Sequence, residues 1–186
     1  MVLGEGSSIC VVEEMEHALD RGAYIYAEIL GFGSCNEGGF SNRRGASELA
    51  LAQAISAALR SAEKSPNDID YVNAHGNSLV EYDRADTRAF RAALGPAADR
   101  VPVSSIKSMI GHALGAAASF QVTATCLTLV QSVIPPTINY DEQDPDCDLD
   151  YVPNQARIAR VRTALINAHA AGGTHSVLLL GAPHTR

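Results

Sequence analysis

Two histidines, each followed by small residues, carry the chemistry that this sequence suggests. His75 ends the segment Tyr71-Val-Asn-Ala-His75-Gly76, and His112 follows Lys107-Ser-Met-Ile-Gly111. Each lies after a short apolar or β-branched run, which predicts a place where a strand ends and a turn or helix begins. Such places bind ligands in open α/β sheets. Lys107, five residues before His112, supplies a charge that could tune the pair. The pattern is typical of a catalytic site that lacks its nucleophile.

The composition indicates one soluble globular domain. The chain has 186 residues, of which 46% are hydrophobic and 19% charged, enough for a sizeable core. Its formal charge of −7 argues against nucleic-acid binding, which needs clustered Lys and Arg. The four cysteines are widely spaced and form no CxxC pair, so neither a zinc site nor a disulfide framework is indicated. The first residues do not resemble a signal peptide, and a cytoplasmic location is expected.

Residues 113–134 carry no charge and are long enough to cross a membrane. The segment contains Gln121, Gln131, several Ser and Thr residues and mostly Ala among its apolar positions. A membrane helix would be more hydrophobic. We therefore expect no membrane association, and predict a soluble helix that is buried on all sides, with Gly115 and its alanine neighbours permitting close packing.

The order of predicted elements indicates an α/β fold. Alternating strands and helices imply a mostly parallel sheet that is covered on both faces. A Gly/Asn/Ser-rich loop is expected through Gly45. The expected strands are residues 7–13, 24–33, 69–74, 101–104, 163–168 and 175–181, and the expected helices are residues 14–21, 47–62, 83–94 and 112–133.

Several segments, in order along the chain, resemble motifs of the β-ketoacyl synthases, the condensing enzymes of fatty acid and polyketide synthesis. They include the two histidine segments, Gly4-Glu-Gly-Ser-Ser-Ile-Cys-Val-Val-Glu13, Ile134-Pro-Pro-Thr-Ile-Asn139, Asp144-Pro-Asp-Cys-Asp-Leu-Asp-Tyr-Val-Pro153 and Asn167-Ala-His-Ala-Ala-Gly-Gly-Thr174. The resemblance covers residues 2–180 but only the second half of a ketosynthase. The half that carries the reactive cysteine has no counterpart here.

The resemblance implies a thiolase-like fold, specifically its C-terminal half. That half is a mixed, mostly parallel five-stranded sheet with a buried central helix, and a second chain would complete it. Residues 1–186 would form a single domain. Within it, residues 1–22 would complete the partner's N-terminal half with a strand and a short helix, and residues 23–186 would form the C-terminal half. A natural gene split and a processed fragment both account for this arrangement.

The resemblance also implies a reaction, decarboxylative Claisen condensation of acyl and malonyl thioesters. His75 and His112 would donate hydrogen bonds to the malonyl thioester oxygen as the enolate develops. A helix N-terminus at His112 would favour its neutral form. Lys107 would pair with Asp83 and hold the network, and Asp86 would contribute. The backbone N–H of Ala171 would be a second oxyanion donor.

Three departures from the family pattern bear on substrate binding. The family usually has Thr-Ser-Thr after the His-Gly pair, where hydroxyls contact the pantetheine arm; this chain has Asn77, Ser78 and Leu79. Asn77 and Ser78 remain expected substrate-binding residues. His169 and Ala171 replace two phenylalanines, so the acyl pocket would be open at Ala171. His169 is either a substitute donor or, as we favour, a polar residue that faces the missing half.

No metal or cofactor is expected, because the substrates would travel on the phosphopantetheine of an acyl carrier protein. The histidines lack the spacing of helical metal ligands. The alternating aspartates of residues 144–150 lack the Gly and Glu of a calcium loop. Expected partners are the cysteine-bearing half, a chain-length factor or second ketosynthase, and acyl carrier protein. The alternative function is a non-catalytic scaffold or a chain-length-factor-like subunit.

Overall fold

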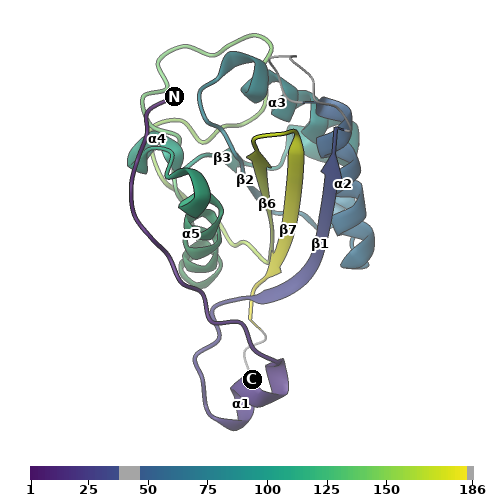
Figure 1. The fold of residues 1–186 in the computed structure, drawn as a ribbon, viewed down its shortest axis with the longest axis vertical. Helices are drawn as coiled ribbons and strands as arrows, with labels where there is room; N and C mark the ends of the chain where they lie inside the picture. Colours follow the sequence, from purple (N-terminus) through teal and green to yellow (C-terminus); the bar gives the residue numbers. More distant parts are fainter. Residues whose placement is uncertain (38–46, 184–186) are drawn as a thin grey trace.

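The structure is a computed structural model that describes residues 1–37 and 47–183. Its main sheet has five strands in the order β1-β7-β6-β2-β3 (Figure 1). A separate two-stranded sheet pairs β4 with β5. The strands are β1 (Glu28–Asn36), β2 (Tyr71–Asn73), β3 (Val103–Ser104), β4 (Val133–Ile134), β5 (Arg157–Ile158), β6 (Thr163–Ala170) and β7 (Thr174–Gly181).

The strand directions confirm the predicted mixed, mostly parallel sheet. Strand β2 runs parallel to both β3 and β6, whereas β7 runs antiparallel to both β1 and β6. Four strands therefore run in one direction and β7 alone runs in the other. The consequence for function is that β2, β3 and β6 bring their carboxyl ends to the same end of the sheet, where α/β proteins bind ligands.

Helices cover both faces of the sheet. Helices α2 and α3 pack together and α2 contacts β1 and β7, whereas α5 contacts β6 and β7 from the other side (Figure 1). The α-helices are α1 (Met15–Asp20), α2 (Glu48–Ser61), α3 (Val80–Leu94), α4 (Lys107–Ile110) and α5 (Ala117–Gln131). Short 3₁₀ helices are Pro66–Asp68, Gly95–Asp99 and Leu114–Ala116.

Alternation along the central strands divides the core into two clusters. Successive side chains of a strand point to opposite faces. Thus Val72 and Leu165 join the cluster beneath α2 and α3, whereas their neighbours Tyr71, Ala164 and Ile166 join the cluster beneath α5. The period of two in these short apolar runs is what allows one sheet to support helices on both sides.

The prediction that the helix following His112 is buried on all sides is wrong. The helical stretch Leu114–Gln131 is long and apolar enough to cross a membrane by length and composition, yet only 28% of it is buried. One face of α5 packs on the sheet through Gln121, Thr125 and Leu129, while Leu127 and Val130 are exposed. Three of the five buried residues of α5 are polar, namely Gln121, Thr125 and Thr128, so hydrogen bonding helps to specify its covered face.

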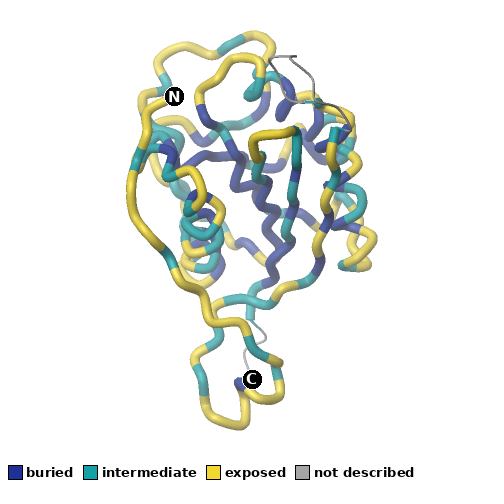
Figure 2. The backbone as a smooth tube through the Cα atoms, viewed as in Figure 1, coloured by how far each residue is buried: buried dark blue, intermediate teal, exposed yellow. Residues whose placement is uncertain are grey.

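The strand expected at residues 7–13 does not form. Residues 4–14 contain no helix or strand. They run alongside α5 and then leave the body as an arm that ends in α1 (Figures 1 and 2). The apolar side chains of the arm point to solvent, with Ile9 92% exposed. A strand needs a hydrogen-bonded neighbour, and the sheet described here offers this segment none. The division of the chain at residue 22 remains a prediction.

The other boundaries shift by a few residues. Strand β1 begins at Glu28 instead of residue 24, and α3 begins at Val80 instead of residue 83. Ser47 caps α2, since its side chain accepts a hydrogen bond from the Ala50 N–H. Most of the glycine-rich loop expected through Gly45 lies outside the described residues.

Glycines in β1 allow α2 to approach the sheet closely. A Cβ at Gly33 would collide with the carbonyl oxygen of Ala54, and one at Gly31 would lie 2.7 Å from the carbonyl oxygen of Ala58. Both obstacles are helix backbone, which cannot turn aside as a side chain can. The small residues of β1 therefore set the distance between α2 and the sheet.

This contact predicts that Gly33→Ala destabilises the chain by about 2 kcal/mol or more, since overpacking a core costs about 1–3 kcal/mol. Urea unfolding followed by circular dichroism measures the loss. Gly115→Ala is the matched control, because a Cβ at Gly115 meets nothing within 4 Å. Equal stability of the two variants would contradict the close packing.

Candidate active site

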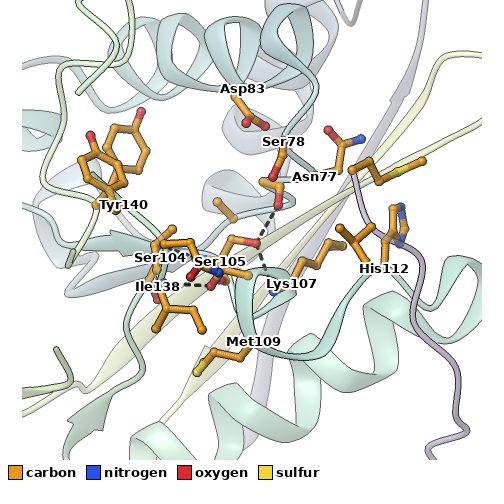
Figure 3. Close-up of a pocket in the computed structure, with 18 of the residues that line it drawn as sticks. Asn77, Ser78, Asp83, Ser104, Ser105, Lys107, Met109, His112, Ile138 and Tyr140 are labelled. Carbon is orange, nitrogen blue, oxygen red and sulfur yellow. Dashed lines mark hydrogen bonds between the residues drawn. The ribbon is translucent and has the colours of Figure 1, made fainter. Parts of the chain in front are cut away.

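The candidate site lies at the carboxyl ends of β2, β3 and β6. His75 follows the end of β2 by two residues, Lys107 follows β3 by three, and His169 is the penultimate residue of β6. A cavity of about 670 Å³ opens beside them, with Asn77, Lys107 and His112 in its wall (Figure 3). Parallel strands therefore bring together side chains that are up to 94 residues apart.

The two histidines singled out by the sequence face each other. Their ring centroids are 5.2 Å apart in an edge-to-face arrangement, and His75 is only 3% exposed. The Nδ1 atom of His75 lies 3.3 Å from the backbone N–H of His169, and Nδ1 of His112 lies 3.2 Å from that of Leu114. A backbone N–H can only donate. The Nδ1 of His112 therefore accepts, and the proton of its neutral ring is left for Nε2. The His75 ring takes the same form when its Nδ1 accepts from His169.

Both rings are held neutral. Burial, with a further effect of the Lys107 charge, lowers the pKa of His75 to about 2. Burial and the same lysine also lower the pKa of His112. A neutral imidazole with its proton on Nε2 is a hydrogen-bond donor that is not a strong acid. The two side chains are thus suited to stabilise negative charge on an oxygen.

The first residues of the chain hold the backbone of His112 on both sides. His112 N–H donates to the Val2 carbonyl at 2.9 Å, and Gly4 N–H donates to the His112 carbonyl at 3.0 Å. Val2 and Leu3 also line the cavity. A Cβ at Gly4 would collide with the carbonyl oxygen of Ile110, so no side chain fits there. The Gly-Glu-Gly motif therefore positions the second histidine.

The predicted ion pair between Lys107 and Asp83 is wrong. The Lys107 ammonium instead donates to the His75 carbonyl at 2.7 Å and to Gln121 Oε1 at 3.3 Å. No carboxylate of the described residues lies within ion-pair distance of it. Burial lowers the pKa of Lys107 to about 8, and the nearby charges of Asp86 and Asp83 counteract part of that effect. The lysine therefore fixes the His75 main chain directly.

Asp86 has a different partner, His169. Their Oδ1 and Nε2 atoms are 2.6 Å apart, and both side chains are almost wholly buried. Asn167 donates to the other oxygen of Asp86 and accepts the His75 N–H at 3.0 Å. The His169 ring lies 4.7 Å from that of His75 and 4.5 Å from that of His175. His169 is therefore an interior member of the site.

Three buried residues of this network were not anticipated. Gln121 donates to the carbonyls of Ala74 and Asn167, each at 3.1 Å. His175 binds Glu37 at 2.8 Å. The signal available in the sequence was Gln121 within a charge-free apolar segment, together with Asn167 and His175 inside apolar strands. Buried polar groups of this kind need partners, and the sequence does not say which.

The remaining predicted residues are divided between the cavity and the surface. Ser78 and Asp83 line the cavity with Asn77 (Figure 3). Asn77 Nδ2 lies 3.2 Å from Nε2 of His75. Ala171, in contrast, lies in the exposed turn between β6 and β7 and is not among the lining residues. The roles assigned to these residues, including that of Ala171 as an oxyanion donor, remain predictions.

In the described part of the chain, no group of three or more His, Cys, Asp and Glu side chains has an arrangement that could hold a metal ion. The imidazoles contact one another edge to face, and two of them bind carboxylates through Nε2. Hydrogen bonding thus accounts for this polar cluster.

A sequence model of the family described as "Beta-ketoacyl synthase, C-terminal domain" matches residues 26–141, more than half of the chain. The chain belongs to this family. The matched range contains His75, Lys107 and His112, and the conserved architecture is the thiolase-like one predicted above.

Comparison with known proteins supports the same assignment. The chain is 47% identical over 182 residues to the tetracenomycin polyketide synthase ketoacyl synthase alpha subunit of Streptomyces glaucescens, covering 98% of this chain and 43% of that protein. A solved type II polyketide synthase acyl carrier protein in complex with its ketosynthase matches with a TM-score of 0.88 and 42% identity, over 92% of this chain and 42% of the other. The ishigamide ketosynthase/chain length factor matches with a TM-score of 0.87 and 37% identity, over 92% and 41%. This ketosynthase domain thus spans about two fifths of its relatives.

The environment of Asp83 predicts a pH-dependent effect on stability. Burial, and then the charge of Asp86, raise the pKa of Asp83 from 3.8 to about 6. Because the pKa is higher in the folded state, the contribution of Asp83 to the free energy of unfolding is fully present below about pH 4. That contribution is lost as the pH rises through about 6. Asp83→Asn replaces the carboxyl with an amide that does not ionise, so the loss of stability at higher pH disappears. Its stabilising effect should be larger at pH 7.5 than at pH 5, by about 1 kcal/mol.

Urea unfolding of the ketosynthase domain at the two pH values measures this difference. Asp141→Asn, at an exposed position, is the control and should give the same change at both. If the change in unfolding free energy caused by Asp83→Asn does not vary with pH, the raised pKa of Asp83 is contradicted.

Proposed function

We propose that this chain supplies the histidine and lysine part of a composite β-ketoacyl synthase site whose cysteine comes from a second polypeptide. The observation that carries the proposal is the pair of buried neutral imidazoles, each with Nδ1 occupied by a backbone N–H. Their Nε2–H groups are then donors for a substrate oxygen. The acyl and malonyl groups would be thioesters on the phosphopantetheine of acyl carrier protein.

The reaction follows from these donors. The bond between the malonyl carboxylate and its methylene carbon breaks, carbon dioxide leaves, and the electron pair forms an enolate. His75 and His112 stabilise the enolate oxygen. The enolate carbon then attacks the acyl thioester on the partner's cysteine, and the carbon–sulfur bond breaks to release a thiolate. The negative charge of the malonyl carboxylate thus ends on sulfur, without any need for a proton from the imidazoles.

The chain's own cysteines do not fit the nucleophile. Cys147 alone among them lines the cavity that contains His112. Burial raises the pKa of its thiol, which reduces the thiolate fraction near pH 7. Cys10 and Cys126 line a second cavity, between the arm and α5. These positions support a sulfur contributed in trans.

The apolar surface beside α5 supports a protein partner. The second cavity, of about 650 Å³, is lined by Ile9, Val11, Val122 and Leu127 among others. Surfaces of this kind mark interaction sites. We assign the cysteine-bearing half to this face. By analogy with the similar structures, acyl carrier protein and a chain-length factor or second ketosynthase complete the assembly.

A non-catalytic scaffold or chain-length-factor-like subunit is the second candidate. It is favoured by Asn77 and Leu79 at the expected pantetheine contacts and by the exposed Ala171. The retained pair of neutral histidines favours the enzyme. The two functions differ in whether the assembled complex releases carbon dioxide from malonyl-acyl carrier protein.

We expect His75→Ala to lower carbon dioxide release by the assembled complex about 100-fold, the usual effect of losing one oxyanion donor. The assay follows malonyl-acyl carrier protein after co-purification with a cysteine-bearing thiolase-half protein. Arg60→Ala, at an exposed position of α2 on the other face of the sheet, is the control and should retain full activity while still co-purifying.

Release that is unchanged by His75→Ala would exclude a catalytic role for this histidine. An assembled wild-type complex that releases no carbon dioxide would identify the chain as the scaffold. A chain that remains a stable monomer with α5 exposed, and binds no cysteine-bearing half, would remove the composite site altogether.

A further inference from the structure

We propose that Asn77 is a catalytic hydrogen-bond donor, whose side-chain amide donates together with His75 Nε2–H to one thioester oxygen. This inference rests on the proposed condensing function and goes beyond contact with the pantetheine arm. It depends on the orientation of two side chains, each of which is fixed by a backbone group.

The first fixed orientation is that of the Asn77 amide. Its Oδ1 accepts the Leu79 N–H at 3.0 Å, and the side chain is only 7% exposed. The intervening Ser78 has a left-handed backbone, with φ of 62°, which curls the chain so that this short-range bond forms. Exchanging the amide's O and N would set its NH₂ against the Leu79 N–H. The Nδ2 group therefore points away from Leu79, toward His75 Nε2 at 3.2 Å.

The second fixed orientation is that of the His75 ring. Its Nδ1 faces the His169 N–H at 3.3 Å, and its Nε2 faces Asn77 Nδ2. Both ring nitrogens thus face groups that can only donate. Because the buried ring is neutral near pH 7, it carries one N–H. That N–H must face another donor, either the His169 N–H or the Asn77 NH₂ group, and this contact is unfavourable.

An oxygen ligand resolves this conflict. With the proton on Nε2, the His75 N–H and the Asn77 NH₂ are adjacent donors with no acceptor between them among the described residues. A thioester oxygen that enters from the cavity, which Asn77 lines, can accept from both. Two preorganised donors on one oxygen are the arrangement that stabilises an enolate.

The alternative proton position explains why the oxygen matters. With the proton on Nδ1, Nε2 would accept from Asn77, but Nδ1–H would then face the His169 N–H. The ring in this form has no donor for substrate. Binding of an acceptor oxygen therefore selects the Nε2–H form. The fixed Asn77 amide makes this selection depend on the ligand, because its NH₂ group cannot accept the Nε2–H bond itself. A threonine hydroxyl at this position could donate or accept, and so would not impose it.

The first test uses the full chain without any partner. Nitrogen-15 NMR of the His75 ring and the Asn77 side-chain amide is recorded with and without acetyl-pantetheine, a simple thioester. We expect both Nε2–H and Nδ2–H₂ signals to shift together in the wild type. In Asn77→Asp, a carboxylate accepts Nε2–H permanently, so the ring should show the Nε2–H form before any thioester is added. An Asn77 amide that does not respond to the thioester, or a ring unchanged by Asn77→Asp, overturns the proposal.

The second test uses the assembled complex and measures kcat and KM for malonyl decarboxylation. Asn77→Ala should lower kcat about 100-fold with KM changed less than about threefold, because a donor used mainly in the transition state is lost. Asn67→Ala, at an exposed position, is the control and should leave both constants unchanged. A raised KM with unchanged kcat would make Asn77 a binding contact only and overturn the catalytic role.

The two tests separate this inference from the proposed function. If the wild-type complex releases no carbon dioxide, the condensing function fails and the catalytic role of Asn77 fails with it. The NMR response would still show whether Asn77 and His75 share an oxygen as ligand donors. If the complex is active and Asn77→Ala is as active as wild type, the inference alone fails.

Discussion

The buried amide of Gln121 is the interaction on which the site depends. Its Nε2 donates to the carbonyls of Asn73, Ala74 and Asn167, and its Oε1 accepts from Lys107. These partners come from the ends of β2 and β6 and from the start of α4, and the side chain is 0% exposed. One residue of α5 therefore joins the segments that carry His75, Lys107 and His169. Leaving those carbonyls unpaired in the interior would be costly, so the helix is held at one height and rotation against the sheet.

Electrostatics follow from this closure of the site. Burial removes water from His75 and lowers its pKa, and the Lys107 charge, which Gln121 holds in place, lowers it further. The same burial is tolerable for Lys107 because Asp86 and Asp83 lie nearby. The carboxylate of Asp86 is in turn bound by His169. The site thus keeps His75 and His112 neutral mainly through burial, with help from the Lys107 charge, and without direct ion pairing of the lysine.

Local patterns predicted much of this fold, because apolar periodicity reports which faces are buried. The positions of His75 and His112 at the ends of short elements followed from the same reasoning. Long-range choices could not be predicted. The sequence offered Asp83 and Asp86 as ion-pair partners for Lys107, yet its ammonium binds the His75 carbonyl and the Gln121 amide. The arm's β-branched run indicated a strand, but strand formation needs a neighbouring strand, which the described residues do not provide. Gln121 resembled a tolerated exception in an apolar helix, because the carbonyls that it binds lie more than 40 residues away.

The exposed arm has a consequence for the cell as well as for the fold. Ile9, Val11 and Val12 expose β-branched side chains, and the backbone of this segment pairs with no strand among the described residues. Segments of this kind template edge-to-edge aggregation. Copies of the chain made in excess of whatever covers the arm would therefore be drawn into self-association or chaperone binding. If a second polypeptide covers the arm as proposed, the amount of this chain that stays soluble is limited by the supply of that partner, which favours matched synthesis of the two.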